Sequence, residues 1–280
     1  MRILLLGGTG FIGAAVSGRL IADGHQTVTV GRGDRADAAI DVTDNAALSR
    51  HLSDHDYDTV VNLLGAGLTP GTTDAASMTA VNSALPPSLL ALLNGLGEAP
   101  HLIHAASSTE RLAGQTADES EYSRTKHEGT SALRVLAEVS PSPVTILTIH
   151  NTYGPGQPDR RFVAYLIDRL GHGLPVELNY PGRIRDFVFL DDVVTCVAHA
   201  VESGPSGPRE VEVGTGQGTS LLDAARAVAS ALGQPPALVT ATASPSEDPN
   251  PMTVAGTLAG TYGLCTTGFV EGVRRTIEEA

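Results

Sequence analysis

The chain has little cysteine, few basic residues and no tryptophan. Its two cysteines, Cys196 and Cys265, are too few and too far apart in the sequence for a disulfide scaffold or a zinc cluster, and they indicate reduced thiols in a cytoplasmic protein. The nine histidines show no metal-ligand spacing, so no metal site is expected. Eighteen Lys and Arg against 31 Asp and Glu give a net charge of -13, which repels phosphate backbones and anionic lipid. We therefore expect no nucleic-acid partner and no membrane partner.

The sequence also lacks a continuous apolar run of the ~20 residues that a membrane-spanning helix needs. The stretch between Arg2 and Arg19 is uncharged and could pass for a secretory signal, but five glycines interrupt it. Apolar residues at 41% and charged residues at 18% are ordinary for a globular protein. At ~150 residues per domain, the 280 residues correspond to about two units, or to one large domain with an added lobe.

The N-terminal segment is typical of a strand, a glycine turn and a helix. Residues 2–6 form an aliphatic run, Gly-Gly-Thr-Gly-Phe-Ile-Gly follows at 7–13, and apolar side chains then recur at helical spacing. Gly7 allows a tight turn, Gly10 lets backbone N–H groups approach a pyrophosphate, and Gly13 lets the helix pack closely on the strand. In this context the glycines indicate dinucleotide binding, whereas alone they would also fit a bare turn.

The second expected strand, at 27–30, ends without an acidic residue. A carboxylate there would bind the adenosine ribose and exclude a 2′-phosphate, but this chain has Gly31-Arg32-Gly33. Because Arg32 can pair with a 2′-phosphate, the sequence favours NADP(H) and leaves NAD(H) open. A solvated loop arginine is the alternative interpretation.

Further strands are expected at 58–64 and 101–106, with helices between them. The alternation predicts an α/β fold with a Rossmann-type doubly wound parallel sheet. Ligands of such sheets bind at the C-terminal ends of the strands, where the strand at 101–106 would deliver Ser107, Ser108 and Thr109.

The only lysine of the chain stands four residues after a tyrosine. Of the 18 basic residues, 17 are arginine. On a helix, Tyr122 and Lys126 would share one face, and the ammonium would lower the pKa of the phenol and make it a usable acid or base. A surface tyrosine packed on a lysine stem is the alternative. That an arginine-rich chain keeps one lysine here favours the catalytic interpretation.

With these motifs, the sequence resembles the extended branch of the short-chain dehydrogenase/reductase superfamily, the NAD(P)-dependent epimerase/dehydratase family, over nearly the whole chain. The glycine turn matches the cofactor turn of that family, and Tyr122-x-x-x-Lys126 matches its catalytic pair. Other segments similar to family motifs are Asp41-Val42, 60–65, Val81-Asn82, 151–156 and 185–193.

The motifs and the resemblance together give the expected site. The catalytic residues are Thr109, Tyr122 and Lys126. The cofactor-binding residues are Gly7, Thr9, Gly10, Phe11, Ile12, Gly13, Arg32, Asp41, Val42, Leu63, Leu64, Gly65, Asn82, Lys126 and His150. The substrate-binding residues are Ser108, Glu110, Asn151 and Arg185. The resemblance also implies a homodimer, because members of the family often pair through two helices.

Three departures from the family limit what the resemblance implies. Leu112-Ala113-Gly114 stands where the family has Val-Tyr-Gly, an alignment that selects Thr109 over Ser108 as the catalytic hydroxyl. The stretch 114–122 is short for the branch, and residues 244–256 lack the arginine with which sugar-nucleotide members usually grip phosphate. We therefore expect a small-molecule substrate, with a nucleotide sugar as a candidate.

The resemblance also implies a division of the chain. We expect a dinucleotide-binding domain at 1–153, to which 184–203 returns, and a mainly substrate-binding lobe at 154–280. Helices are expected near 162–170, 191–201, 221–232 and 268–279, and a loop at 243–251.

Three functions fit the expected site. In the first, an NADP(H)-dependent oxidoreductase reduces a carbonyl of a keto-sugar nucleotide or related metabolite, with Tyr122 as proton donor, Thr109 orienting the oxygen and Lys126 holding the cofactor ribose. The second is an epimerase or dehydratase without net cofactor use. Glu110-Arg111 in place of an acid pair counts against dehydration, and the NADP(H) signal counts against epimerisation. The third is a non-catalytic NADP-binding scaffold, which would not need the catalytic residues, so the first is favoured.

Overall fold

The computed structural model describes residues 1–68, 71, 73–114, 119–242 and 262–279. The chain divides into two compact units, one of residues 1–148 with 197–211 and one of residues 149–196 with 212–280. The loop expected at 243–251 lies outside the described residues.

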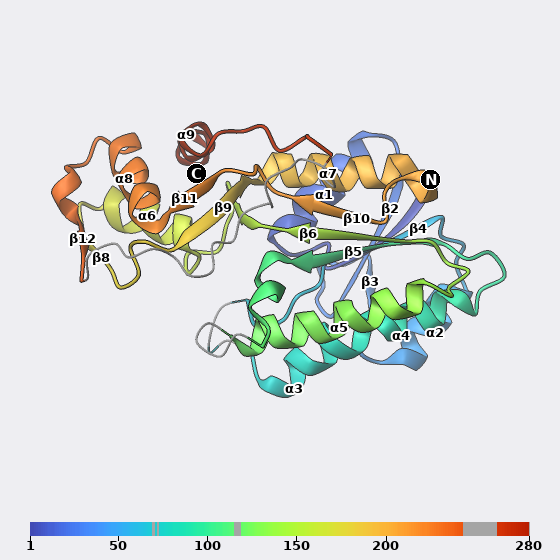
Figure 1. Cartoon of the computed structure of the whole chain (residues 1–280). Coiled ribbons are helices and arrows are strands. Elements are labelled where there is room, and N and C mark those ends of the chain that lie inside the picture. Colours follow the sequence, from blue (N-terminus) through green and yellow to red (C-terminus); the bar gives the residue numbers. More distant parts are fainter. Residues whose placement is uncertain (69–70, 72, 115–118, 243–261, 280) are drawn as a thin grey trace. The chain divides into compact units, whose positions relative to one another are not determined.

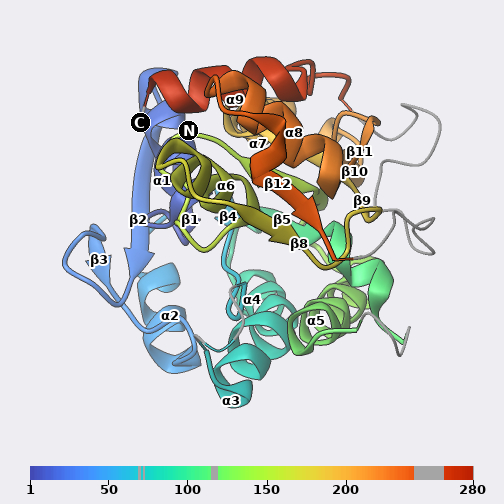
Figure 2. The ribbon, with the colours of Figure 1, turned by 90° about the vertical axis from the view of Figure 1, so that its left-hand side faces the viewer.

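The first unit is built on a sheet with helices on both faces. Its elements are β1 (Arg2–Leu6), α1 (Phe11–Ala22), β2 (Gln26–Gly31), β3 (Ala38–Ala39), α2 (Asn45–Ser53), β4 (Thr59–Asn62), α3 (Ala75–Met78), the π-helix η1 (Thr79–Ala84), α4 (Leu85–Asn94), β5 (His101–Ser107), the 3₁₀ helix η2 (Ser108–Leu112), α5 (Glu121–Ala137) and β6 (Val144–Ile149). Helices α2, α4 and α5 cover one face and α1 the other (Figures 1 and 2). The elements α7 (Leu190–Ser203) and β10 (Glu210–Val213) contribute residues to both units, as does β6 through Ile149.

The sheet has the strand order β10-β6-β5-β4-β1-β2-β3. Strand β1 pairs in parallel with both β2 and β4, and β4 pairs in parallel with β5. The order therefore reverses between β1 and β4, which is where doubly wound sheets bind their ligands. This arrangement confirms the predicted α/β class with a Rossmann-type sheet.

The core of the first unit explains its aliphatic strands. Ile3, Leu4, Leu5 and Leu6 are all fully buried, because helices cover both faces of the sheet. Neither face is exposed to solvent, so apolar and polar residues do not alternate along the strand. Leu4 and Leu6 belong to one buried cluster with the α4 leucines Leu85, Leu89, Leu90 and Leu93.

The helical run Ala75–Asn94, made of α3, η1 and α4, is 20 residues long and apolar enough to cross a membrane by length and composition alone. The expectation that no such run exists is therefore wrong. Its leucines pack into the core of the first unit, as in the core helices of globular proteins, which pass the same test.

The second unit has smaller sheets, of which one is β11-β9-β7 and one is β12-β8. Its elements are β7 (Asn151–Tyr153), α6 (Phe162–Gly171), β8 (Val176–Leu178), β9 (Ile184–Phe189), β11 (Gly218–Ser220), α8 (Leu221–Ala231), the 3₁₀ helix η4 (Pro236–Leu238), β12 (Val239–Ala241) and α9 (Phe269–Glu278), and a short 3₁₀ turn η3 (Gly204–Ser206) follows α7 in the first unit. The four helices expected after residue 160 are all present, and each end lies within two residues of its expected position.

Tyr153 lies at the centre of the second core. Its ring centroid is 5.7 Å from that of Phe189 and 5.1 Å from that of Phe269, and its hydroxyl donates to the Phe269 carbonyl at 3.1 Å. A Cβ placed on Gly272 would come within 2.1 Å of the Tyr153 hydroxyl oxygen, so only glycine lets α9 approach this closely.

The two cysteines meet in the second unit. The Sγ atoms of Cys196, on α7, and Cys265, before α9, are 3.6 Å apart, and both thiols are free. Both cysteines are free thiols, as the sequence predicts, although the fold brings together two residues that are 69 positions apart in the sequence.

Candidate active site

The glycine turn joins β1 to α1 at the reversal point of the sheet. Gly7 has φ +83°, in the left-handed region that favours glycine, and the Gly10 N–H donates to the Gly7 carbonyl at 3.0 Å. A Cβ on Gly13 would lie 2.0 Å from the Gly7 carbonyl oxygen, so α1 can pack on the turn only because residue 13 is glycine. Exposed Gly10 begins the helix without a side-chain cap, which leaves backbone donors for an anion. These residues fit a dinucleotide pyrophosphate.

The end of β2 carries a cation and no acidic side chain. Arg32 directly follows the strand and is exposed, and a Cβ on Gly31 would be 4.0 Å from Thr9 Oγ1 in the glycine turn. The carboxylate of Asp37, in the loop after β2, accepts the N–H and the hydroxyl of Thr29 at 2.8 and 2.7 Å. These bonds, the backbone one first, hold the pKa of Asp37 below its ordinary value.

Asp41 and Val42, expected near the adenine, have different surroundings. The exposed Asp41 carboxylate accepts the Thr43 N–H at 3.0 Å and its hydroxyl at 2.7 Å. These bonds, with a smaller contribution from the charge of Arg32, lower the pKa of Asp41. Val42 is buried in the core of the first unit.

Residues that follow β4 lie between the glycine turn and α5. A Cβ on Gly7 would be 3.2 Å from the Leu63 carbonyl carbon, and a Cβ on Gly65 would be 3.7 Å from the Tyr122 hydroxyl oxygen. The half-buried Tyr122 ring therefore lies beside the C-terminal end of β4. The structure thus brings together the predicted glycine turn, the 63–65 segment and the predicted catalytic tyrosine.

Lys126 lies one helical turn after Tyr122 on α5, as the spacing predicts. Its side chain is buried, and its Nζ donates to the Ala105 carbonyl in β5 at 2.6 Å. Burial lowers the pKa of Lys126, and the Glu110 carboxylate opposes that shift. The ammonium therefore sits at the C-terminal end of β5 with a nearby counter-charge.

The turn after β5 holds the predicted hydroxyl. Thr109 Oγ1 shares a 2.8 Å hydrogen bond with Ser107 Oγ, whereas Ser108 is buried. Glu110 closes a capping box at this turn, where its carboxylate accepts the Ser107 N–H at 2.8 Å. The same carboxylate oxygen accepts the Thr130 hydroxyl of α5 at 3.1 Å.

A buried polar chain that sequence reasoning missed continues from Glu110. Asn62 Nδ2 donates to His104 Nδ1 at 3.2 Å, which leaves the ring proton on Nε2, 3.5 Å from Thr130 Oγ1. Burial first, and then the charges of Lys126 and Arg134, keep the pKa of His104 well below its ordinary value. His104 is therefore a neutral link between β4 and α5. Its strand position was visible in the sequence, but no pattern there identifies its partners.

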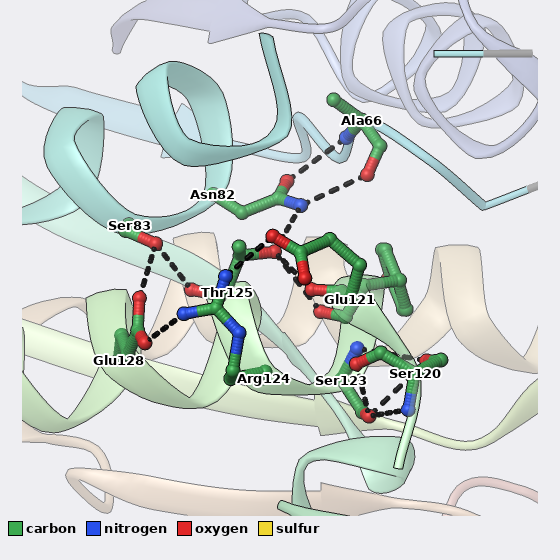
Figure 3. Close-up of polar contacts among 10 residues, drawn as sticks. Ala66, Asn82, Ser83, Ser120, Glu121, Ser123, Arg124, Thr125 and Glu128 are labelled. Atoms are coloured by element: carbon green, nitrogen blue, oxygen red, sulfur yellow. Dashed lines mark hydrogen bonds and ion pairs between the residues drawn. The ribbon is translucent and has the colours of Figure 1, made fainter. Parts of the chain in front are cut away.

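Asn82 lies in the π-helix η1 and is engaged with both sides of the site (Figure 3). Its side chain accepts the Ala66 N–H at 2.9 Å and donates to the Ala66 carbonyl at 2.8 Å and to Thr125 Oγ1 at 3.0 Å. On α5, a Cβ placed on Gly129 would come within 1.9 Å of the backbone carbonyl oxygen of Asn82. Asn82 thus holds the loop after β4 against the helix of Tyr122 and Lys126, and its contact with a cofactor stays a prediction.

The predicted residues His150, Asn151 and Arg185 belong to the second unit. His150 Nε2 lies 2.7 Å from a Glu212 carboxylate oxygen, and the buried His150 Nδ1 has no hydrogen-bond partner within the described part of the chain. Asn151 pairs in register with Phe187. Arg185, buried on β9, donates to the Ile184 carbonyl at 2.6 Å. Their roles toward cofactor and substrate stay predictions.

Next to Arg185, Asp186 organises a turn that sequence reasoning missed. Its carboxylate accepts the N–H of Thr215 at 3.0 Å, the hydroxyl of Thr215 at 2.6 Å and the N–H of Gly216 at 2.8 Å. Among the residues that the structure describes, no group of three His, Cys, Asp or Glu side chains is placed to hold a metal ion.

Comparison with known proteins agrees with this arrangement. The sequence model of the NAD dependent epimerase/dehydratase family matches residues 3–214. The chain belongs to this family. The resemblance of the motifs to the extended short-chain dehydrogenase/reductases is thereby confirmed.

The names of two curated relatives refer to enzymes of nucleotide sugars. The chain is 28% identical to a dTDP-6-deoxy-L-talose 4-dehydrogenase (NAD(P)(+)) of Kitasatospora kifunensis. The alignment of 243 residues covers 78% of this chain and 75% of the relative. The chain is 26% identical to a dTDP-L-rhamnose 4-epimerase of Burkholderia thailandensis. This alignment of 297 residues covers 84% of this chain and 82% of the relative.

Solved structures show the same fold. The UDP-glucose 4-epimerase of Thermotoga maritima, solved with UDP-glucose, superposes with a TM-score of 0.81 at 21% identity and covers 100% of this chain and 98% of its own. The UDP-glucose 4-epimerase of Thermus thermophilus, solved with NAD, gives a TM-score of 0.78 at 22% identity with the same coverage.

Proposed function

We propose that this protein is an NAD(P)-dependent oxidoreductase that reduces a carbonyl group of a keto-sugar nucleotide, with Tyr122 as the proton donor. The observation that carries the proposal is the placement of the Tyr122 phenol beside Gly65 and of the buried Lys126 ammonium at the end of β5, both at the binding edge of the sheet. The name of the 4-dehydrogenase relative supports a net redox reaction.

The nicotinamide, when bound, supplies the hydride that reduces the carbonyl carbon. Tyr122 gives its phenolic proton to the carbonyl oxygen, and Thr109 donates a hydrogen bond that orients the same oxygen. The positive charge of Lys126 favours the phenolate that Tyr122 becomes after the transfer. Burial lowers the pKa of Lys126, and the negative charge of Glu110 opposes this shift.

The cofactor would be held by the glycine turn, with Gly10 and the start of α1 receiving the pyrophosphate. We propose NADP(H) as the preferred form, because exposed Arg32 follows β2 and Thr29 already occupies the nearby Asp37 carboxylate. In the second unit, Asn151 and Arg185 are proposed to bind the substrate.

Dehydration is less favoured by the surroundings of Glu110. A dehydratase needs acidic side chains free to move protons on the substrate, whereas the buried Glu110 carboxylate is bound to Ser107 and Thr130 and the next residue is Arg111. Epimerisation is the second candidate, because a 4-epimerase is among the relatives.

We also propose that the protein forms a homodimer through α5. At the C-terminal end of this helix three apolar side chains are exposed, namely Val135 at 72%, Leu136 at 40% and Val139 in the following turn at 84%. These exposed apolar side chains near one end of α5 are the residues that we propose to lie in the contact between subunits.

The function is tested by incubating the protein with a panel of keto-sugar nucleotides and either NADPH or NADH. The proposal expects stoichiometric oxidation of the cofactor with formation of the hydroxyl product, at higher kcat/KM with NADPH. Conversion of a nucleotide sugar to its epimer without net cofactor consumption would replace reduction by epimerisation. Cofactor binding without conversion of any sugar in the panel would contradict both reduction and epimerisation. The non-catalytic NADP-binding scaffold would then be the remaining function.

A further inference from the structure

Two contacts hold the segment before α9 against α7 in the second unit. The Asp192 carboxylate accepts the Thr267 N–H at 2.8 Å and the Thr267 hydroxyl at 2.9 Å. One helical turn further along α7, Cys196 meets Cys265 with 3.6 Å between the sulfurs. Because Asp192 and Cys196 share one face of the helix, the first contact fixes the backbone close to the second.

The two thiols differ in access. Cys196 is 1% exposed, whereas Cys265 is partly exposed and lines a cavity of about 280 Å³ together with Thr215, Gln217 and Phe269. A molecule the size of hydrogen peroxide can therefore reach Cys265 first, and Cys196 is placed behind it.

We propose that Cys196 and Cys265 are a modification site at which a peroxide-class oxidant forms a disulfide that ties α7 to the segment before α9. The Cys265 thiolate attacks one oxygen of hydrogen peroxide, the O–O bond breaks, and hydroxide leaves with a sulfenic acid formed on Cys265. The Cys196 thiolate then attacks that sulfur, the S–O bond breaks, and the S–O oxygen leaves as water. In total two thiols lose two electrons and two protons, and one peroxide becomes two waters.

The geometry requires only a local movement. The sulfurs must approach from 3.6 Å to the ~2.05 Å of a disulfide bond, which side-chain rotation and a small shift of the segment before α9 can supply. The described cysteines have no other thiol as an intramolecular partner, because the whole chain contains two cysteines.

The surroundings make the reaction slow at neutral pH and faster in alkali. The hydrogen bond with Cys196 first, then burial, and then the charges of Cys196, Asp192 and Asp186 raise the pKa of the Cys265 thiol well above its ordinary value. Tyr262 on the same segment has its pKa raised by burial and by Cys196. Since the thiolate is the reactive form, the rate of oxidation rises with pH.

The test treats the full chain with hydrogen peroxide at pH 7 and pH 9 and records intact mass, free thiols and non-reducing peptide maps. We expect loss of the mass of two hydrogen atoms, disappearance of both thiols, a linked peptide pair that contains Cys196 and Cys265, and reversal by dithiothreitol. The linked protein should melt roughly 5 °C higher, because a long loop is closed in its unfolded state. The reaction should be faster at pH 9.

Cys196→Ala is the matched control, because it removes the second thiol and leaves the accessible one. In this variant Cys265 should gain oxygen and no linked peptide should form. If wild-type protein gains oxygen on separate cysteines without a link, or links only between chains, the proposal is wrong. The wild-type measurement decides the matter even if the variant does not fold.

Discussion

The Lys126 ammonium donates to the carbonyl oxygen of Ala105 at 2.6 Å, so the only lysine of the chain joins α5 to the end of β5. The side chain is buried there, with 3% of its surface exposed. Guanidinium groups are planar and larger and project their donors in a fixed fork. The contact therefore gives a physical reason why this position is not arginine.

Lys126→Arg is expected to keep the net charge of -13 and to lose most activity, because the larger group is displaced from the Ala105 carbonyl and from the proposed catalytic position. Turnover with the best keto-sugar substrate measures the effect. Arg124→Lys is the matched control on the same helix, where the arginine binds Glu121 and Glu128 at the surface. Equal turnover in Lys126→Arg and Arg124→Lys would refute a requirement for lysine.

Glu110→Gln is expected to move the alkaline limb of the pH profile of kcat/KM to lower pH. The carboxylate opposes the fall in the pKa of buried Lys126, so the uncharged glutamine lets that pKa fall further, and the ammonium is lost at lower pH. The amide oxygen of glutamine can still accept the hydrogen bonds from the Ser107 N–H and the Thr130 hydroxyl. The substitution therefore removes the negative charge and keeps these structural contacts. The control Glu121→Gln, on the exposed face of α5, should leave the limb in place, and an unmoved limb in Glu110→Gln would contradict the role of this carboxylate.

Gly129→Ala is expected to destabilise the fold by about 1–3 kcal/mol and to lower turnover, because its Cβ would meet the Asn82 carbonyl at 1.9 Å and push α5 away from η1. The matched control is Gly18→Ala in α1, where a Cβ meets nothing within 4 Å. That change should stabilise the helix by up to ~1 kcal/mol. Chemical denaturation measures both, and equal effects would show that the contact with Asn82 has no structural importance.

Arg32→Ala is expected to weaken NADPH binding by about 1.5–3 kcal/mol, the range for hydrogen bonds to charged groups, and to leave NADH binding nearly unchanged. Calorimetric titration with each cofactor gives the two affinities. Equal losses for NADPH and NADH would show that Arg32 is a loop residue without a role in cofactor choice.

The sequence was sufficient to predict the parts of the site that are set by local spacing. The glycine turn was predictable because Gly7, Gly10 and Gly13 are each needed for steric reasons within one strand–turn–helix unit. Tyr122 and Lys126 were predictable as neighbours because four residues bring side chains to the same face of a helix. The doubly wound parallel sheet was predictable from the alternation of strands and helices.

Contacts between distant segments were not predictable in the same way. Glu110 was predicted as a substrate-binding residue from its place after Thr109, and nothing in the sequence indicated that its carboxylate accepts the hydroxyl of Thr130, twenty residues away. The π-helix at Thr79–Ala84 has no periodic signal of its own, although it places Asn82 against α5. The meeting of Cys196 and Cys265 depends on packing in the second unit, which sequence separation does not report.

The most direct test of the central claim is Tyr122→Phe, assayed for NADPH-dependent reduction of the keto-sugar nucleotide that wild type reduces best. Phenylalanine keeps the ring beside Gly65 and removes only the hydroxyl that is proposed to donate the proton. The account predicts unchanged NADPH affinity and unfolding temperature, with turnover lower by ~10²- to 10⁴-fold, as expected when a general acid is removed. Wild-type turnover in this variant would contradict the account, because the reaction would then proceed without the phenol.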